Sequence, residues 1–125
     1  MNILLVDDEE SFLDVMKALL NAAGHSVLLA GDGKAAREVL DLEKIDLIIS
    51  DIMMPTLDGA RFHSYVREFT ANSDVPFIFM SGLTDVAQML DMDPARDFFL
   101  SKNSNAEEIL KLVDQVSLQD SDASA

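Results

Sequence analysis

Short, continuous apolar runs recur five times along the chain, and each run ends in polar residues. Runs of this length that do not alternate with polar positions are typical of strands buried on both faces of a parallel sheet. Between and after these runs, apolar residues recur at helical spacing. The predicted strands are 3–6, 25–30, 47–50, 75–80 and 98–100, and the predicted helices contain 12–20, 34–42, 59–70 and 106–117.

The order of these elements predicts the fold class. Strands alternate with helices, the connections are short, and the segment 85–90 supplies one or two further helical turns before the last strand. Such alternation predicts an α/β fold with a doubly wound, five-stranded parallel sheet and helices on both faces. With 125 residues, the chain is expected to form one domain, residues 1–118, followed by a polar, acidic tail at 119–125.

Composition narrows the range of functions. The net charge of −14 makes direct contact with nucleic acid or with an anionic membrane surface unfavourable. No apolar stretch reaches the length of about 18 residues that a membrane span needs. The chain contains no cysteine, which excludes disulfides and thiol chemistry. We therefore expect a cytoplasmic protein.

Polar side chains at the strand ends carry the candidate chemistry. Asp7 and Asp8 follow the first strand, Asp51 the third, Ser81 the fourth and Lys102 the fifth. Parallel strands bring their carboxyl ends to one edge of a sheet, where ligands of open α/β folds bind. The two acidic clusters are therefore expected to meet. Each residue also has an ordinary explanation, because an Asp after a strand usually caps a turn and a lone Lys usually lies at the surface.

The two histidines have no neighbours in the sequence that resemble a metal-ligand set. We expect His25 and His63 at the surface or at a strand edge, without a functional role. The remaining acidic residues of the first cluster, Glu9 and Glu10, are explained by the N-terminus of the first helix, where the helix dipole favours negative charge.

The complete set of strand-end motifs resembles the receiver domains of two-component response regulators. The matching segments occur in the family's order and spacing over nearly the whole chain, and they are Leu5-Val6-Asp7-Asp8, Asp51 with Met54-Pro55 and Asp58-Gly59, Ser81-Gly82, and Phe99-Leu100-Ser101-Lys102. The resemblance implies the flavodoxin-like strand order 2-1-3-4-5.

The resemblance also implies a phosphoryl-accepting site that contains Mg²⁺. Asp51 would be the nucleophile and would become an aspartyl phosphate. Asp7, Asp8 and Asp51 would hold the metal together with the backbone carbonyl of Met53, because Mg²⁺ prefers oxygen ligands. A divalent cation would also make three neighbouring carboxylates tolerable.

Two further groups would contact the phosphoryl oxygens. Lys102 would pair with one oxygen, and the Ser81 hydroxyl would donate to another. In the family, the residue equivalent to Phe99 is an aromatic switch. Phosphorylation is therefore expected to draw the Ser81 hydroxyl inward and to let Phe99 move from an exposed to a buried position.

The sequence departs from the family pattern at several positions. Asn103 follows Lys102 where the family usually has a cis proline. A cis bond before a non-proline residue costs about 2.5–4 kcal/mol, and the sequence leaves the conformation of this bond open. The segment between Ser81 and Lys102 is about one residue short in comparison with the family pattern, which affects the surface that signals to partners. Met53 and Leu83 stand where polar side chains would orient a hydrolytic water, so slow self-dephosphorylation is expected.

We therefore expect a stand-alone phosphoacceptor receiver that is phosphorylated by a sensor histidine kinase or a histidine phosphotransfer protein and acts on an unidentified downstream protein. It would not be an enzyme beyond its own phosphorylation and slow dephosphorylation. Two alternatives stay open. A small Mg²⁺-dependent aspartyl-phosphate phosphatase usually has a second Asp where this chain has Met53, and a degenerate receiver that only binds proteins would not need the intact acidic set.

Overall fold

The computed structural model describes residues 1–51, 59–69, 74–81 and 96–124. The predicted helical turns at 85–90 lie outside these ranges. The elements in chain order are β1 (Asn2–Val6), α1 (Glu10–Ala22), β2 (Ser26–Ala30), α2 (Gly33–Leu42), β3 (Leu47–Asp51), α3 (Gly59–Phe69), β4 (Phe77–Ser81), β5 (Asp97–Ser101) and α4 (Ala106–Ser124).

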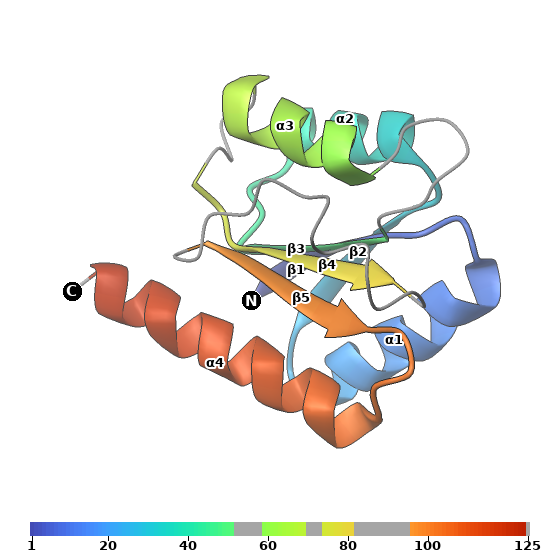
Figure 1. The fold of residues 1–125 in the computed structure, drawn as a ribbon, viewed down its shortest axis with the longest axis vertical. Coiled ribbons are helices and arrows are strands. Elements are labelled where there is room, and N and C mark those ends of the chain that lie inside the picture. The colour runs from blue at the N-terminus through green and yellow to red at the C-terminus, as the bar shows by residue number, and fades with distance from the viewer. Residues whose placement is uncertain (52–58, 70–73, 82–95, 125) are drawn as a thin grey trace.

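The five strands form one sheet in the order β2-β1-β3-β4-β5, and every neighbouring pair is parallel. Helices α1 and α4 cover one face of the sheet, and α2 and α3 cover the other (Figure 1). This arrangement confirms the predicted doubly wound fold and its strand order. None of the helices in the described part of the chain combines the length and the apolar character that a membrane crossing requires.

Two apolar clusters, one on each face of the sheet, stabilise these layers. The cluster under α2 and α3 contains Phe62 and Phe79, and the cluster under α1 and α4 contains Met16 and Val113. The central strand β3 contributes to both and is buried along its whole length. A continuous apolar strand suits this position, because each fully buried Leu or Ile side chain contributes roughly 1.5–3 kcal/mol.

Local signals in the sequence set the helix ends next to the sheet. Helix α2 begins after Asp32, whose side-chain Oδ1 accepts a hydrogen bond from the Ala35 N–H at 2.8 Å. Helix α1 ends before Gly24, which has a φ of 95° and so adopts the left-handed conformation that a side chain would disfavour. Both signals are visible in the sequence.

Some boundaries differ from the prediction. The last helix continues to Ser124 instead of ending near residue 117, because its final residues include neither proline nor glycine, so 119–124 is helical in backbone. Strand β4 begins at Phe77 and not at Val75, since Pro76 has no N–H for a ladder, although its carbonyl accepts from the Ile48 N–H. The Lys102–Asn103 bond, whose conformation the sequence leaves open, is trans.

The prediction for His63 was wrong. His63 is buried, with 9% of its surface exposed, and its ring lies 5.0 Å from the rings of both Phe77 and Phe79. Its Nε2 lies 2.9 Å from Oδ1 of Asp97, a carboxylate at the start of β5 whose side chain is fully buried. A polar ring can be buried here because Asp97 supplies a hydrogen-bond partner. His25, by contrast, is half-buried beside the start of β1, as expected for a strand edge.

Arg67 completes this buried polar group. Its Nη2 donates to Asp97 Oδ1 at 2.7 Å, and its Nη1 donates to the Val75 carbonyl at 2.5 Å. His63 and Arg67 are four residues apart on α3 and therefore project from the same side of the helix. The group ties α3 to the amino end of β5 across β4.

We expect Asp97→Ala to lower the free energy of unfolding by about 3–5 kcal/mol, because it removes the buried carboxylate that pairs with the largely buried Arg67 guanidinium. Urea denaturation followed by circular dichroism would measure this. The matched control is Asp74→Ala, which removes an exposed carboxylate 2.9 Å from Arg96 and should cost no more than about 1 kcal/mol. Equal losses in the two variants would contradict the structural importance assigned to the buried group.

Candidate functional site

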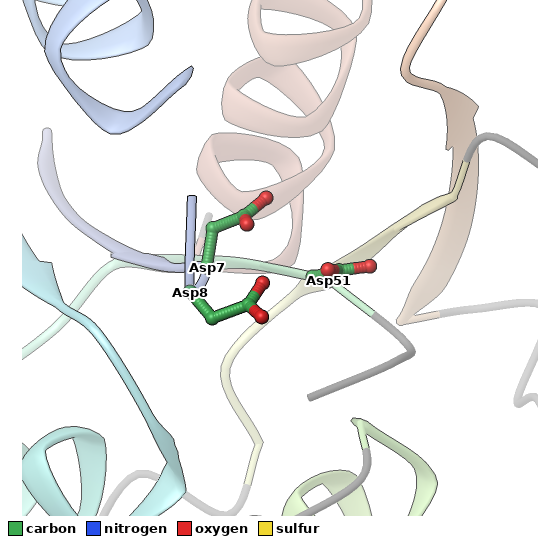
Figure 2. A group of neighbouring side chains, drawn as sticks. All are labelled: Asp7, Asp8 and Asp51. Atoms are coloured by element: carbon green, nitrogen blue, oxygen red, sulfur yellow. The ribbon is translucent and has the colours of Figure 1, made fainter. Parts of the chain in front are cut away.

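The sheet register brings the two acidic clusters together. Val6 of β1 lies opposite Ser50 of β3, so the next residues, Asp7 and Asp51, are neighbours at the carboxyl ends of adjacent strands. Asp8 follows directly beyond β1 (Figure 2). One carboxylate oxygen from each of the three residues lies within 4.8 Å of the others. The predicted meeting of the acidic clusters is therefore observed.

The three carboxylates differ in their contact with solvent. Asp7 is 2% exposed and Asp51 is 7% exposed, whereas Asp8 is open to solvent. Two buried carboxylates and an exposed one at such short separations repel one another. The cluster therefore needs positive charge close to it.

Lys102 supplies part of that charge. It follows β5, and its Nζ lies 2.7 Å from Asp7 Oδ2 and 3.2 Å from Asp51 Oδ2. The ammonium also lies 4.9 Å from the centre of the Phe12 ring, a favourable cation–π position. Lys102 is thus held by groups from β1, β3 and α1, and its side chain is 18% exposed.

The protonation of the site follows from burial and charge. Burial raises the pKa of the Asp7 carboxyl above its usual value, although Lys102 and the backbone N–H of Glu9 act in the opposite direction. Burial alone would lower the pKa of Lys102, but the hydrogen bond and charge of Asp7 and the charge of Asp51 raise it. Lys102 is therefore firmly cationic at neutral pH.

The residues fit a divalent cation. Asp7 Oδ1 accepts a hydrogen bond from the Glu9 N–H at 2.9 Å, which fixes the carboxylate. Its other oxygen, Oδ2, is buried and forms an ion pair with the Lys102 ammonium at 2.7 Å. That oxygen retains capacity for a further ligand. A set of carboxylate oxygens suits a hard cation such as Mg²⁺.

The structure describes some of the predicted site residues completely and others only in part. It brings together Asp7, Asp8, Asp51 and Lys102. The Ser81 backbone pairs with Ser101 at the end of β4, while its side chain lies outside the description.

Met53 and Phe99 are the other two residues with a predicted role at the site. The backbone carbonyl predicted at Met53 lies outside the described residues. Phe99 is half-buried and packs against the cluster under α2 and α3. It therefore already contacts the core, and the predicted change in its position stays a prediction.

Two contributions to the site were missed in the sequence. The sequence pattern identifies Phe12 only as part of an apolar helix face, whereas its ring lies beside the Lys102 ammonium. The Glu9 backbone N–H orients Asp7, a contribution that the residue type at position 9 does not indicate. The position of Phe12, one turn after the acidic pair, is the signal that could have indicated its proximity.

Comparison with known proteins gives a consistent result. Residues 3–114 match the family model for the response regulator receiver domain. The response regulator MprA of Mycobacterium leprae is 32% identical over 111 residues, which cover 88% of this chain and 48% of that protein. The chain spans only about a third to a half of the length of the curated relatives it matches.

Solved structures agree with this result. The chemotaxis protein CheY4 of Vibrio cholerae superposes with a TM-score of 0.82 at 28% identity, covering 92% of this chain and 97% of that one. The receiver domain of the sensor histidine kinase PA1611 of Pseudomonas aeruginosa gives a TM-score of 0.79 at 27% identity, covering 91% and 94%. That structure has a magnesium ion coordinated in its active site cleft.

We expect Asp7→Asn to raise the free energy of unfolding at pH 7 when no divalent cation is present. Because the pKa of Asp7 is raised, the folded state binds a proton there more readily than the unfolded chain. The usual pKa of this carboxyl is 3.8, and below that pH its contribution to stability is fully present. That contribution is lost as the pH rises through the raised pKa of the folded state. Asn cannot ionise and avoids that loss. Urea denaturation across pH 4–8 would measure the effect.

The matched control for this prediction is Asp8→Asn, whose carboxylate is exposed and whose removal should change stability little without metal. Added Mg²⁺ should stabilise the parent chain, since binding to the folded state alone shifts the equilibrium. Both variants should lose most of that gain. If Asp7→Asn is less stable than the parent chain in metal-free buffer, ionisation of the buried Asp7 carboxyl does not destabilise the fold.

Proposed function

Because the chain belongs to the receiver domain family of response regulators, we propose that Asp51 accepts a phosphoryl group in two-component or phosphorelay signalling and that phosphorylation changes partner binding. The observation that carries the proposal is the grouping of Asp51 with Asp7, Asp8 and Lys102 at one edge of the sheet. The proposed donor is a sensor histidine kinase or a histidine phosphotransfer protein.

The proposed reaction is an in-line displacement at phosphorus. A carboxylate oxygen of Asp51 forms a bond to the phosphorus of a phosphohistidine, and the bond from phosphorus to the imidazole nitrogen breaks. The imidazole keeps the electron pair, and the product on Asp51 is a mixed anhydride. Asp51 suits this role because it is 7% exposed and is held at the end of a fully buried strand, which limits its motion.

The surrounding groups would stabilise the transferred charge. Lys102 can pass from the carboxylates to a phosphoryl oxygen, and the Ser81 hydroxyl would donate to another. Mg²⁺ would be held by Asp7, Asp8, Asp51 and the Met53 carbonyl. When bound, it supplies positive charge against the transferred oxygens. The magnesium ion in the similar PA1611 receiver domain supports this choice of metal.

The chain would have a limited catalytic role, and phosphorylation would change its conformation. The chain would catalyse only its own phosphorylation and a slow loss of phosphate, because Met53 and Leu83 cannot orient a water. Phe99 would become more buried in the phosphorylated state, with Ser81 as the contact to the phosphoryl group. A cytoplasmic location is part of the proposal and is supported by family membership, while the stand-alone arrangement stays a prediction.

We expect Asp51→Asn to abolish phosphorylation by a small acyl-phosphate donor in the presence of Mg²⁺, because the amide nitrogen and oxygen of Asn are poor nucleophiles. Intact mass and peptide mapping would measure incorporation. Asp74→Asn, which removes an exposed carboxylate at a distant loop, should be phosphorylated like the parent chain. Labelling that persists in Asp51→Asn, or that is unaffected by EDTA, would refute the proposed site.

The surface beside the site suits an apolar contact with the phosphodonor. Val15 on α1 is 68% exposed, although it is a large apolar residue. Phe12, one turn earlier, is half-buried and lies next to Lys102. Contiguous apolar surface marks protein contacts, and Val15 and Phe12 both add apolar surface to α1. The donor protein would therefore rest on α1 while its histidine reaches Asp51.

We expect Val15→Asp to slow phosphotransfer from a histidine kinase or phosphotransfer protein by about tenfold, equivalent to ~1.4 kcal/mol, because a buried contact is lost. Phosphorylation by a small acyl phosphate should be unchanged. The control is Leu42→Asp at the end of α2, which is 83% exposed. Rapid-quench assays would compare the two donors. Equal slowing in both variants would argue against α1 as the contact surface.

A further inference from the structure

Phe12 differs from the other residues around the acidic edge because it has no polar group, yet its ring contacts the Lys102 ammonium. The centre of the ring lies 4.9 Å from Lys102 Nζ. The same nitrogen lies 2.7 Å from Asp7 Oδ2 and 3.2 Å from Asp51 Oδ2. An ammonium has three N–H donors, so two carboxylates and one aromatic face can hold it from three sides.

The start of α1 fixes the position of the Phe12 ring. Phe12 is half-buried and packs against the apolar cluster under α1 and α4, which includes its neighbours Leu13 and Met16. The Glu9 N–H donates to Asp7 Oδ1 at 2.9 Å, and the Glu9 carbonyl accepts from the Leu13 N–H at 3.1 Å. The segment that places Asp7 beside the ammonium therefore also places the ring there.

The Lys102 ammonium needs contacts at its tip, because the backbone fixes only the base of this side chain. Ser101 closes a turn around Lys102. Its Oγ accepts from the Asn103 N–H at 3.1 Å, and its carbonyl accepts from the Ser104 N–H at 3.0 Å. Beyond the backbone, the four-carbon stem of a lysine is flexible. The position of the ammonium therefore depends on the groups that it contacts.

The three contacts of the ammonium would respond differently to the proposed reaction. Asp7 and Asp51 are also the proposed ligands of the cation, and Asp51 would lose its carboxylate charge on phosphorylation. Phe12 takes part in neither event. Its ring attracts the ammonium without adding negative charge, so the charge of Lys102 stays available for a phosphoryl oxygen. Phe12 is thus the contact that can persist while the two carboxylate contacts change.

We propose that Phe12 is a positioning residue that keeps the Lys102 ammonium at the acidic edge during phosphorylation, an inference that rests on the function proposed for Asp51. Without the ring, one ammonium N–H would turn to water. The side chain of Lys102, now 18% exposed, would then move toward solvent and meet the phosphoryl oxygens less often. If Phe12 serves only to pack the apolar cluster, its effect on the reaction will not depend on Lys102.

Phosphorylation by acetyl phosphate with Mg²⁺ tests the proposal without a donor protein, so contacts between a donor and α1 do not enter. We expect Phe12→Leu to react about fivefold more slowly, equivalent to ~1 kcal/mol, because leucine keeps apolar packing and loses the aromatic face. Phe12→Tyr keeps that face and should react like the parent chain. The matched control is Phe98→Leu, which changes another aromatic residue packed against the same cluster and should also react like the parent.

A double-mutant comparison separates the positioning of Lys102 from simple packing. Lys102→Met removes the ammonium, so adding Phe12→Leu should cause no further slowing of the residual reaction. A fivefold slowing by Phe12→Leu in both backgrounds would overturn the proposal. Equal rates for Phe12→Leu and Phe98→Leu in the parent background would overturn it as well.

A measurement without metal or phosphoryl donor keeps this proposal distinct from the proposed function. Carbon-13 relaxation of Lys102 Cε should show an ordered tip in the parent chain and in Phe12→Tyr, and a loss of order in Phe12→Leu. If the parent chain is not phosphorylated on Asp51, the proposed function fails, and the relaxation measurement still decides whether Phe12 holds Lys102. Equal order of Lys102 Cε in the parent chain and in Phe12→Leu would overturn the proposal.

Discussion

The structure depends on a balance of charge at the carboxyl ends of β1 and β3. The sheet order makes these strands neighbours, and the register of Val6 with Ser50 then forces Asp7 and Asp51 together. Two buried carboxylates this close are unfavourable on their own. Lys102 compensates by reaching Asp7 Oδ2 at 2.7 Å and Asp51 Oδ2 at 3.2 Å. The fold therefore keeps an acidic edge that is only partly neutralised, which is the condition that favours binding of a divalent cation.

Much of this edge could be predicted because it follows from topology. Continuous apolar runs identify parallel strands, and the carboxyl ends of parallel strands coincide. The polar residues that end those runs must then share one edge, whatever their side-chain conformations. Asp7, Asp51 and Lys102 meet for this reason. The contact of Lys102 with Phe12 could not be predicted in this way, because it depends on how α1 packs and on the path of one long side chain.

The buried group on the other face of the sheet shows where sequence patterns fail. Histidine is intermediate in its tendency to be buried, and nothing near His63 in the sequence indicates a partner. Its partner, Asp97, is 34 residues away and belongs to a different element. Burial of both residues becomes acceptable only when Arg67 joins them. Such a group is determined by tertiary packing, and a periodic pattern in one segment cannot reveal it.

The same buried group limits where β5 can move. Asp97 and Phe99 are two residues apart on β5 and therefore lie on the same face of the strand. Asp97 is held by His63 and Arg67 of α3, so the amino end of this face is fixed. Phe99 is half-buried two residues closer to the carboxyl end, where Lys102 and the acidic residues lie. The whole of β5 also pairs with β4, so a change in the packing of Phe99 needs only a rotation of its side chain. The amino end of β5 is therefore anchored to α3, and its carboxyl end carries a partly exposed aromatic ring next to the acidic edge.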